Sequence, residues 1–186
     1  MRETLIDPEI ARNIRLVMLD VDGVLTDGGI YLGATESGEG IELKRFEIMD
    51  GLGIRLMRAS GIEVAIITGR VSGAVSLRAA ELEIDECHQD PSAAKLPIAT
   101  RLLEKFGLEW EQAAFVGDDL PDLPVLRRAG LRVAVANAAS EVKAVAHWTS
   151  RVAGGAGAIR EFAEALLRAR GEWVLRVEEY LNEREG

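Results

Sequence analysis

The sequence has few of the side chains that support thiol or zinc chemistry. Cys87 is its only cysteine, and His88 and His147 are its only histidines, in 186 residues. One cysteine excludes an intrachain disulfide, and we expect Cys87 to be a small buried hydrophobe. A zinc site on the histidines would lack its usual partners, so we expect both to be structural or solvated.

Long apolar runs are also missing. No stretch approaches the roughly 20 apolar residues of a membrane-spanning helix. Residues 1–15 carry charges throughout and have no apolar segment of the signal-peptide type. We therefore expect no membrane partner and a location in the cytoplasm.

The formal net charge is −9. Such an acidic chain repels nucleic acid and anionic lipid, and we expect no nucleic-acid partner. It would also repel an anionic substrate, unless local cations or a metal ion reverse the field. The position of each lysine and arginine near a candidate site is therefore informative.

Apolar runs alternate with helical patterns along the whole chain. Continuous apolar strands separated by helices predict a parallel sheet that is covered on both faces. We therefore predict one α/β domain over residues 1–186, with a doubly wound, Rossmann-like sheet. Gly61, Gly107 and Gly130 follow helical patterns and suit left-handed C-caps. The predicted strands are 15–20, 63–68, 84–88, 113–118 and 131–136, and the predicted helices are 52–59, 72–82, 96–106, 121–129 and a tail at about 158–183 that breaks at Gly171.

One segment departs from this alternation. Gly28–Gly33 and Ile41–Glu47 have strand character and flank a glycine-containing turn at Ala34–Gly40. This pattern predicts a β-hairpin insertion over about residues 28–47. The insertion is too short to be a cap domain.

The strongest chemical signal follows the first predicted strand. Asp20 and Asp22 stand at i and i+2 after a buried strand, where both carboxylates can face one site. Such a pair can hold a divalent cation, and one carboxylate can attack phosphorus while the other transfers a proton. A solvated acidic turn is the alternative. A calcium loop is excluded because Leu25 and Tyr31 occupy the positions of its glycine and distal glutamate.

A second acidic cluster follows a later strand. Asp118, Asp119 and Asp122 surround Pro121, which suits the first turn of a helix. Capping of that helix is the alternative role for these acids. Ligands bind at the carboxyl ends of parallel strands, so we expect five carboxylates to converge. Their repulsion would be strong, and Mg²⁺, a hard cation that prefers oxygen ligands, would relieve it.

Cationic and hydroxyl side chains complete the candidate site. Thr68, Gly69 and Arg70 follow the second predicted strand, and a hydroxyl with free N–H groups at such a turn suits a phosphate oxygen. Lys95 precedes a predicted helix. A fixed cation there would offset the carboxylates and stabilise the transition state.

In chain order, these motifs are DxDGVxT, TGR, Lys95 and GDDxxD. The series resembles the haloacid dehalogenase superfamily of phosphatases. The chain is more narrowly similar to a small, capless branch that acts on phosphates of sugar acids such as 3-deoxy-D-manno-octulosonate 8-phosphate (Kdo-8-phosphate). That similarity rests on DGLGIR at 50–55, IEVAIITGR at 62–70, FVGDDLPD at 115–122 and GGAGAIRE at 154–161.

The resemblance implies a role for each matching residue. Asp20 would be the nucleophile and a Mg²⁺ ligand, Asp22 the general acid and base with its backbone carbonyl on the metal, and Asp118 a further ligand. Asp119 and Asp122 would support the metal, and Thr68 and Lys95 would hold the phosphate. Phosphate and sugar acid would be bound by Asp50, Gly51, Arg55, Gly69, Arg70, Arg78 and Lys95. The implied reaction passes through an aspartyl-phosphate and releases Kdo and phosphate.

The chain departs from the family pattern where the sugar is recognised. Glu47 replaces an amide, while Met49 and Ala156 each replace a cation. A nine-carbon acid such as KDN-9-phosphate, or a broad range of sugar phosphates, is therefore an alternative substrate. A receiver-like domain that only stores phosphate is a remote alternative, because Asp22 is placed to accelerate hydrolysis.

Without a cap domain, the site would be open to water. The resemblance implies a homotetramer in which a neighbouring subunit covers it. The hairpin strands, with residues such as Tyr31 and Leu43, have exposed edges that pairing would bury. We expect the helix after Gly171, with Trp173, Leu175 and Val177, to reach the neighbouring subunit as well.

Overall fold

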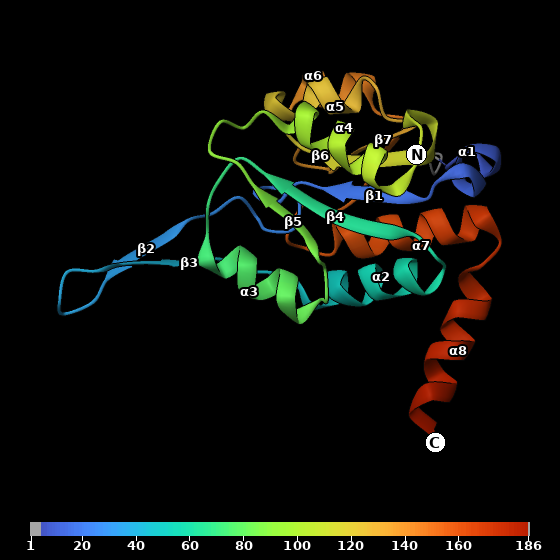
Figure 1. The fold of residues 1–186 in the computed structure, drawn as a ribbon. Coiled ribbons are helices and arrows are strands. Elements are labelled where there is room, and N and C mark those ends of the chain that lie inside the picture. Colours follow the sequence, from blue (N-terminus) through green and yellow to red (C-terminus); the bar gives the residue numbers. More distant parts are fainter. Residues whose placement is uncertain (1–4, 186) are drawn as a thin grey trace.

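The computed structural model describes residues 5–185, so residues 1–4 of the charged N-terminal stretch and Gly186 lie outside the description. A six-stranded sheet lies between two layers of helices (Figure 1). Its strand order is β5-β4-β1-β6-β7-β8, and every neighbouring pair is parallel. The predicted doubly wound sheet is confirmed. The strands are β1 (Leu16–Leu19), β4 (Glu63–Thr68), β5 (Glu86–Gln89), β6 (Ala113–Gly117), β7 (Leu131–Ala134) and β8 (Trp148–Thr149).

Helices cover both faces of the sheet, which explains why the central strands are apolar throughout. One layer contains α4, α5 and α6, and the other contains α2, α3 and α7 (Figure 1). Phe115 of β6 and Phe162 of α7 are among the largest fully buried side chains. The helices are α1 (Pro8–Asn13), α2 (Ile48–Ala59), α3 (Gly73–Glu81), α4 (Lys95–Phe106), α5 (Leu123–Leu126), α6 (Ser140–Val145), α7 (Ala158–Arg170) and α8 (Trp173–Glu185), with 3₁₀ turns at Trp110–Gln112 and Leu120–Asp122.

The predicted hairpin is present and projects from the body of the molecule (Figure 1). Its strands, β2 (Tyr31–Ala34) and β3 (Gly40–Leu43), are antiparallel, and Tyr31 pairs with Leu43. An isolated bridge between Thr26 and Phe46 closes the base of the hairpin. The apolar side chains that it exposes are Ile30, Tyr31, Leu32, Ile41 and Leu43.

Several boundaries differ from the prediction. The first long helix begins at Ile48 rather than Leu52, and α1, α6 and β8 were not predicted because each is only two to six residues long. The helix predicted at 121–129 is a 3₁₀ turn followed by the short α5. The break at Gly171 is confirmed, with a φ of +79°.

The prediction of a left-handed cap at Gly130 was wrong. Gly61 and Gly107 have φ values of +73° and +65°, but Gly130 is not among the positive-φ glycines. Its N–H donates to the carbonyl of Trp110 at 2.8 Å. A Cβ at Gly130 would collide with the backbone of Glu111. Glycine is needed there because two backbone segments approach closely.

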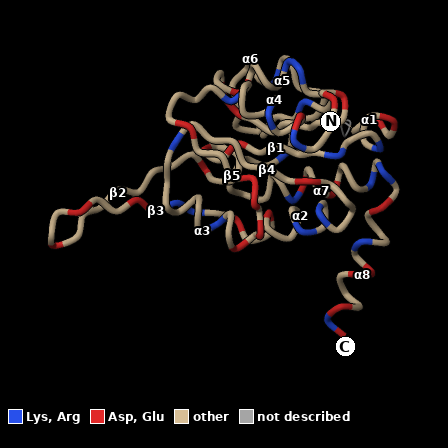
Figure 2. Tube along the Cα trace, in the orientation of Figure 1, with Lys and Arg blue, Asp and Glu red and all other residues tan. Residues whose placement is uncertain are grey.

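Charges of both signs are interspersed over the helices (Figure 2). Cys87 is half-buried on β5 and packs against the core. His88 contacts Glu86, and His147 contacts Arg132. Among residues 5–185, no helix is both long enough and apolar enough to cross a membrane.

Candidate active site

Three polar residues end the three central strands at one edge of the sheet. Asp20 follows β1, Thr68 ends β4 and Asp118 follows β6. Strand β1 lies between β4 and β6. The backbone N–H of Asp20 donates to Val116 at 3.1 Å, which continues the ladder as far as the candidate nucleophile. The shared direction of the strands therefore brings these residues together.

Three of the five predicted carboxylates meet at this edge. One oxygen from each of Asp20, Asp118 and Asp122 lies within 4.8 Å of the others. The Asp22 side chain points to other partners, and Asp119 is exposed at the start of the Leu120–Asp122 turn. The acidic cluster of Asp20, Asp118 and Asp122 is thus smaller than the sequence indicated.

Asp122 is held in place through both of its oxygens. Its Oδ2 accepts hydrogen bonds from the backbone N–H groups of Asp118 at 2.9 Å and Asp119 at 3.2 Å. Its Oδ1 accepts from Lys95 at 2.6 Å. A Cβ at Gly117 would overlap the Asp122 carboxylate, so glycine leaves the space that this residue occupies. Because both oxygens have protein donors, Asp122 is suited to support a cation site.

Lys95 is the only cation among the described residues that is ion-paired within this cluster. It begins α4, and its Nζ lies 2.6 Å from Asp20 Oδ1 as well as from Asp122 Oδ1. Only 5% of its side chain is exposed. Burial acts to lower the pKa of Lys95, but the two carboxylates outweigh burial and raise it. Lys95 is therefore charged at neutral pH.

The acidic cluster carries more negative charge than Lys95 neutralises. Burial and then repulsion from Asp122 raise the pKa of Asp20 to about 8. Burial, Asp122 and Asp119 raise the pKa of Asp118 to about 6. With all three carboxylates ionised, as a bound cation would favour, these acids and one ammonium group carry a formal charge of −2. A hard divalent cation matches both this charge and the oxygen donors, so the residues present fit Mg²⁺, which Asp20 and Asp118 would hold.

The Asp22 carboxylate lies between two cations. Lys44, just past the second hairpin strand, forms an ion pair with Asp22 Oδ1. Arg70 Nε lies 3.8 Å from Asp22 Oδ2, and Arg70 Nη2 lies 2.9 Å from an oxygen of Glu42. Lys44 and Glu42 were not predicted, because tertiary structure sets the path by which the hairpin returns to the body of the molecule.

The glycine-rich segment at 154–157 packs against the loop at 20–26 that carries Asp20 and Asp22, which we call the catalytic loop. Asn137 donates to the Gly23 carbonyl at 3.0 Å and accepts from the Gly154 N–H at 2.7 Å. Gly155 N–H donates to Val24 at 3.1 Å. A Cβ at Gly154 would overlap the backbone of Gly23. Asn137 was not predicted, although a polar residue just beyond an apolar strand is a usable signal.

The predicted phosphate-binding turn is compact. Thr68 is buried, and its hydroxyl accepts from the backbone N–H of Arg70 at 3.4 Å. A Cβ on Gly69 would lie 2.9 Å from the Ala93 side chain, two residues before Lys95. The turn therefore lies beside the segment that delivers the lysine.

The predicted sugar-binding residues on α2 and α3 contact other elements. Asp50 is buried, and its Oδ1 accepts from Arg160 N–H at the start of α7 at 2.8 Å. Arg55 lies 3.0 Å from Glu183 of α8. Arg78 lies 2.8 Å from Glu81, donates to a backbone carbonyl and lies beside Gly51. Within residues 5–185, no hydrogen bond or ion pair joins Asp50, Arg55 or Arg78 to the acidic cluster.

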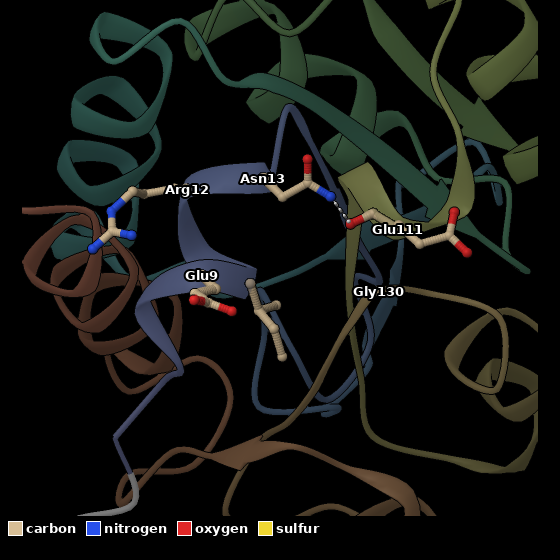
Figure 3. A pocket seen from close by; sticks show the side chains of 6 residues that line it. Glu9, Arg12, Asn13, Glu111 and Gly130 are labelled. Atoms are coloured by element: carbon tan, nitrogen blue, oxygen red, sulfur yellow. Dashed lines mark hydrogen bonds between the residues drawn. The ribbon is translucent and has the colours of Figure 1, made fainter.

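A separate hollow, whose lining side chains are drawn in Figure 3, lies where the sheet strands begin. Its volume is about 520 Å³. Asn13, Glu111 and Gly130 line it, and each precedes the start of a sheet strand. Asn13 Nδ2 donates to the Glu111 carbonyl at 3.1 Å. The hollow is therefore distinct from the candidate active site.

The fold and the site define a class of hydrolase. A family model described as haloacid dehalogenase-like hydrolase matches residues 89–160. These residues include Lys95 and the acidic motif of Asp118 and Asp122. The match agrees with a carboxylate-rich site at the carboxyl edge of a parallel sheet.

Known relatives extend the match over most of the chain. The 3-deoxy-D-manno-octulosonate 8-phosphate phosphatase KdsC of Escherichia coli K12 is 49% identical over 162 residues, or 87% of this chain and 84% of the relative. The chain therefore belongs to the haloacid dehalogenase-like hydrolases, in the capless branch of the Kdo-8-phosphate phosphatases. The predicted enzyme class is confirmed.

Solved structures agree with this placement. The Moraxella catarrhalis 3-deoxy-D-manno-octulosonate 8-phosphate phosphatase, in complex with magnesium, phosphate and KDO, has a TM-score of 0.86 and 38% identity, covering 93% of this chain and 97% of its own. The cobalt-bound phosphatase of Haemophilus influenzae has a TM-score of 0.80 and 37% identity, covering 89% and 94%.

Proposed function

We propose that this enzyme hydrolyses Kdo-8-phosphate to Kdo and inorganic phosphate. The observation that carries the reaction is the buried Lys95, paired with Asp20 and Asp122 beside Asp118. The substrate is supported by the 49% identical Escherichia coli relative and by the KDO bound to the Moraxella catarrhalis enzyme. A cytoplasmic location stays a prediction.

In the first half-reaction, a carboxylate oxygen of Asp20 attacks phosphorus. The bond from phosphorus to the sugar oxygen breaks, and Asp22, which enters this step protonated, donates its proton to that oxygen. Lys95 occupies Oδ1 of Asp20. The other oxygen, Oδ2, is therefore the one we assign to the attack. The products of this step are the free sugar acid and an aspartyl-phosphate at Asp20.

In the second half-reaction, water attacks the aspartyl-phosphate. Asp22, now a carboxylate, takes a proton from the water as its oxygen bonds to phosphorus. The bond between phosphorus and Asp20 breaks, and phosphate leaves. Thr68, Gly69 and Lys95 would hold the phosphate oxygens from the side of the compact turn. When bound, Mg²⁺ would supply charge neutralisation for the carboxylates and the phosphate.

We assign recognition of the sugar acid to Arg70, the partly exposed cation beside Asp22. Arg70 is about half exposed and already contacts Asp22 and Glu42. The Met49 methyl would lie 3.6 Å from a Cβ on Gly157, so the substitutions at Met49 and Ala156 fall in one region. The sugar-binding roles of Asp50, Gly51, Arg55 and Arg78 stay predictions.

A phosphate-release panel tests this function. Kdo-8-phosphate, KDN-9-phosphate, N-acetylneuraminate-9-phosphate and hexose phosphates are compared by kcat/KM. We expect Kdo-8-phosphate to be preferred and EDTA to abolish its turnover reversibly. Preference for a nine-carbon acid would overturn the proposed substrate. No phosphatase activity in a folded, Mg²⁺-loaded sample would overturn the proposed reaction.

We also propose that the chain forms a homotetramer in which a neighbouring subunit covers the site. The hairpin leaves Tyr31, Leu32 and Leu43 more than half exposed. An exposed apolar two-stranded ribbon is a pairing surface. In the tail, Val174, Leu175 and Leu181 are exposed. The prediction that Trp173 helps the tail to reach a neighbouring subunit was wrong, because its ring is buried under Arg160 and Arg168 of the same chain.

A further inference from the structure

The hairpin contributes one buried cation to the candidate active site. Strand β3 is largely exposed, yet the side chain of Lys44, one residue beyond it, is 0% exposed. The ladder ends at Leu43, and the Thr26–Phe46 bridge restarts pairing two residues after Lys44. The backbone on either side of Lys44 is thus fixed, and the lysine is directed at Asp22.

Four charged side chains form a closed ring of ion pairs between the base of the hairpin and the loops after β1 and β4. Lys44 pairs with Asp22, and Asp22 Oδ2 lies 3.8 Å from Arg70. Arg70 lies 2.9 Å from Glu42, and Glu42 Oε1 lies 3.9 Å from Lys44. Two members come from the hairpin, and two come from loops that follow sheet strands. The ring therefore links the hairpin to the loop that carries the acid and base.

Burial of Lys44 is not explained by stability alone. A buried ion pair loses much of its Coulomb energy to desolvation, and apolar side chains of similar size often serve stability as well or better. The hairpin already has apolar residues to pack at its base, such as Phe46. A lysine at this position is better explained by what it contacts.

We propose that Lys44 is a positioning residue for Asp22, an inference that rests on the proposed function. Lys44 engages Oδ1 of the carboxylate, whereas Oδ2 is 3.8 Å from the nearest ring cation. Rotation of the carboxylate would break the Lys44 contact. Lys44 thereby keeps Oδ2 directed to the substrate for proton transfer in both half-reactions, and Glu42 keeps Lys44 beside Asp22.

Leaving-group dependence tests this role. A sugar alkoxide needs a proton as it leaves, whereas p-nitrophenolate departs with little help. Lys44→Met should lower kcat/KM for a sugar phosphate by about 10- to 100-fold, a fraction of the roughly 10²–10⁴-fold that general acid catalysis contributes. The loss with p-nitrophenyl phosphate should be several-fold smaller. Equal losses on both substrates would mean a merely structural role and would overturn the proposal.

A double-mutant cycle adds an independent readout. In an Asp22→Asn background, Lys44→Met should cause no further loss of kcat/KM, because the group it positions no longer transfers protons. Additive losses would contradict the proposal. Lys143→Met, on the exposed surface of α6, is the matched control and should leave kcat/KM for both substrates unchanged.

Two variants guard against a folding defect. Lys44→Arg keeps the charge and should recover part of the sugar-phosphate activity. If Lys44→Met does not fold, Lys44→Gln replaces it in both experiments with the same expected ratio. Any alkyl phosphate that the wild type hydrolyses can serve, so rejection of Kdo-8-phosphate would overturn the proposed substrate while leaving the test of Lys44 intact.

Discussion

Lys95 Nζ lies 2.6 Å from a carboxylate oxygen of Asp20 and 2.6 Å from one of Asp122. Each of these side chains is less than a tenth exposed. The lysine thus opposes the repulsion that would otherwise separate the two acids. It joins the start of α4 to the loops after β1 and β6, so the charge balance of the site depends on one side chain.

Replacing Lys95 should make the fold depend more strongly on metal. Breaking a buried pair leaves uncompensated charge and costs about 3–5 kcal/mol. We expect Lys95→Met to have a lower Tm than the wild type without metal and a larger rise in Tm on addition of Mg²⁺. Differential scanning fluorimetry with a Mg²⁺ titration measures this. Lys143→Met, on the exposed surface of α6, is the control and should match the wild type. An equal Mg²⁺ response in both variants would refute the electrostatic account.

Asp20→Asn should abolish turnover without loss of fold. An amide does not attack phosphorus, and a neutral amide avoids the cost of ionising a side chain at this buried position, where burial and then Asp122 raise the pKa of Asp20 to about 8. We therefore expect no detectable phosphate release and an unchanged or higher Tm in the absence of metal. Asp85→Asn, on the surface just before β5, is the control for a generic aspartate change. Near wild-type turnover by Asp20→Asn would rule out a covalent intermediate at this residue.

The sequence predicted the positions that follow from the sheet itself. Asp20, Thr68 and Asp118 end adjacent parallel strands, and such ends meet at one edge whatever the loops do. Lys44 and Asn137 were not predicted, because each depends on how a distant segment returns to the sheet. Arg55 and Arg78 were assigned to sugar binding from their positions in the motifs. In the structure these long side chains form ion pairs with nearby acids, Arg55 with Glu183 and Arg78 with Glu81.

Asp50 should make stability fall as the pH rises. Burial raises the pKa of Asp50 from 3.8 to about 6, so the folded state binds this proton more tightly than the unfolded state does. The stabilisation is complete below about pH 4 and is lost as the pH rises through 6, by up to about 3 kcal/mol. Urea unfolding of wild type and Asp50→Asn at pH 5 and 8 measures this. At pH 8 the variant should have a higher free energy of unfolding than the wild type. An identical pH dependence of the two proteins would contradict the raised pKa of Asp50.

Gly154→Ala should disturb the catalytic loop from behind. The added Cβ would overlap the Gly23 carbonyl, which also accepts from Asn137. Overpacking costs about 1–3 kcal/mol, and displacement of the loop should lower kcat at least tenfold, roughly the penalty for misplacing catalytic groups by a fraction of an ångström. Gly73→Ala has open space at its Cβ and is the matched control. Stability and kcat close to wild type for Gly154→Ala would show that the loop tolerates displacement.

Charges on the hairpin should separate the subunits and lower activity together. Tyr31 and Leu43 are 54% and 63% exposed and stand opposite each other in the ladder. If hairpins pair between subunits, Tyr31→Asp and Leu43→Glu would bury unpaired charge at that contact. Sedimentation velocity at micromolar concentration should then show a tetramer for the wild type and smaller species for both variants. Ser37→Asp, in the hairpin turn, adds the same charge away from the strand faces and should remain tetrameric. Since the proposal needs a neighbour to cover the site, kcat/KM should fall in step with the tetramer fraction, and a fully active monomer would exclude this role for the hairpin.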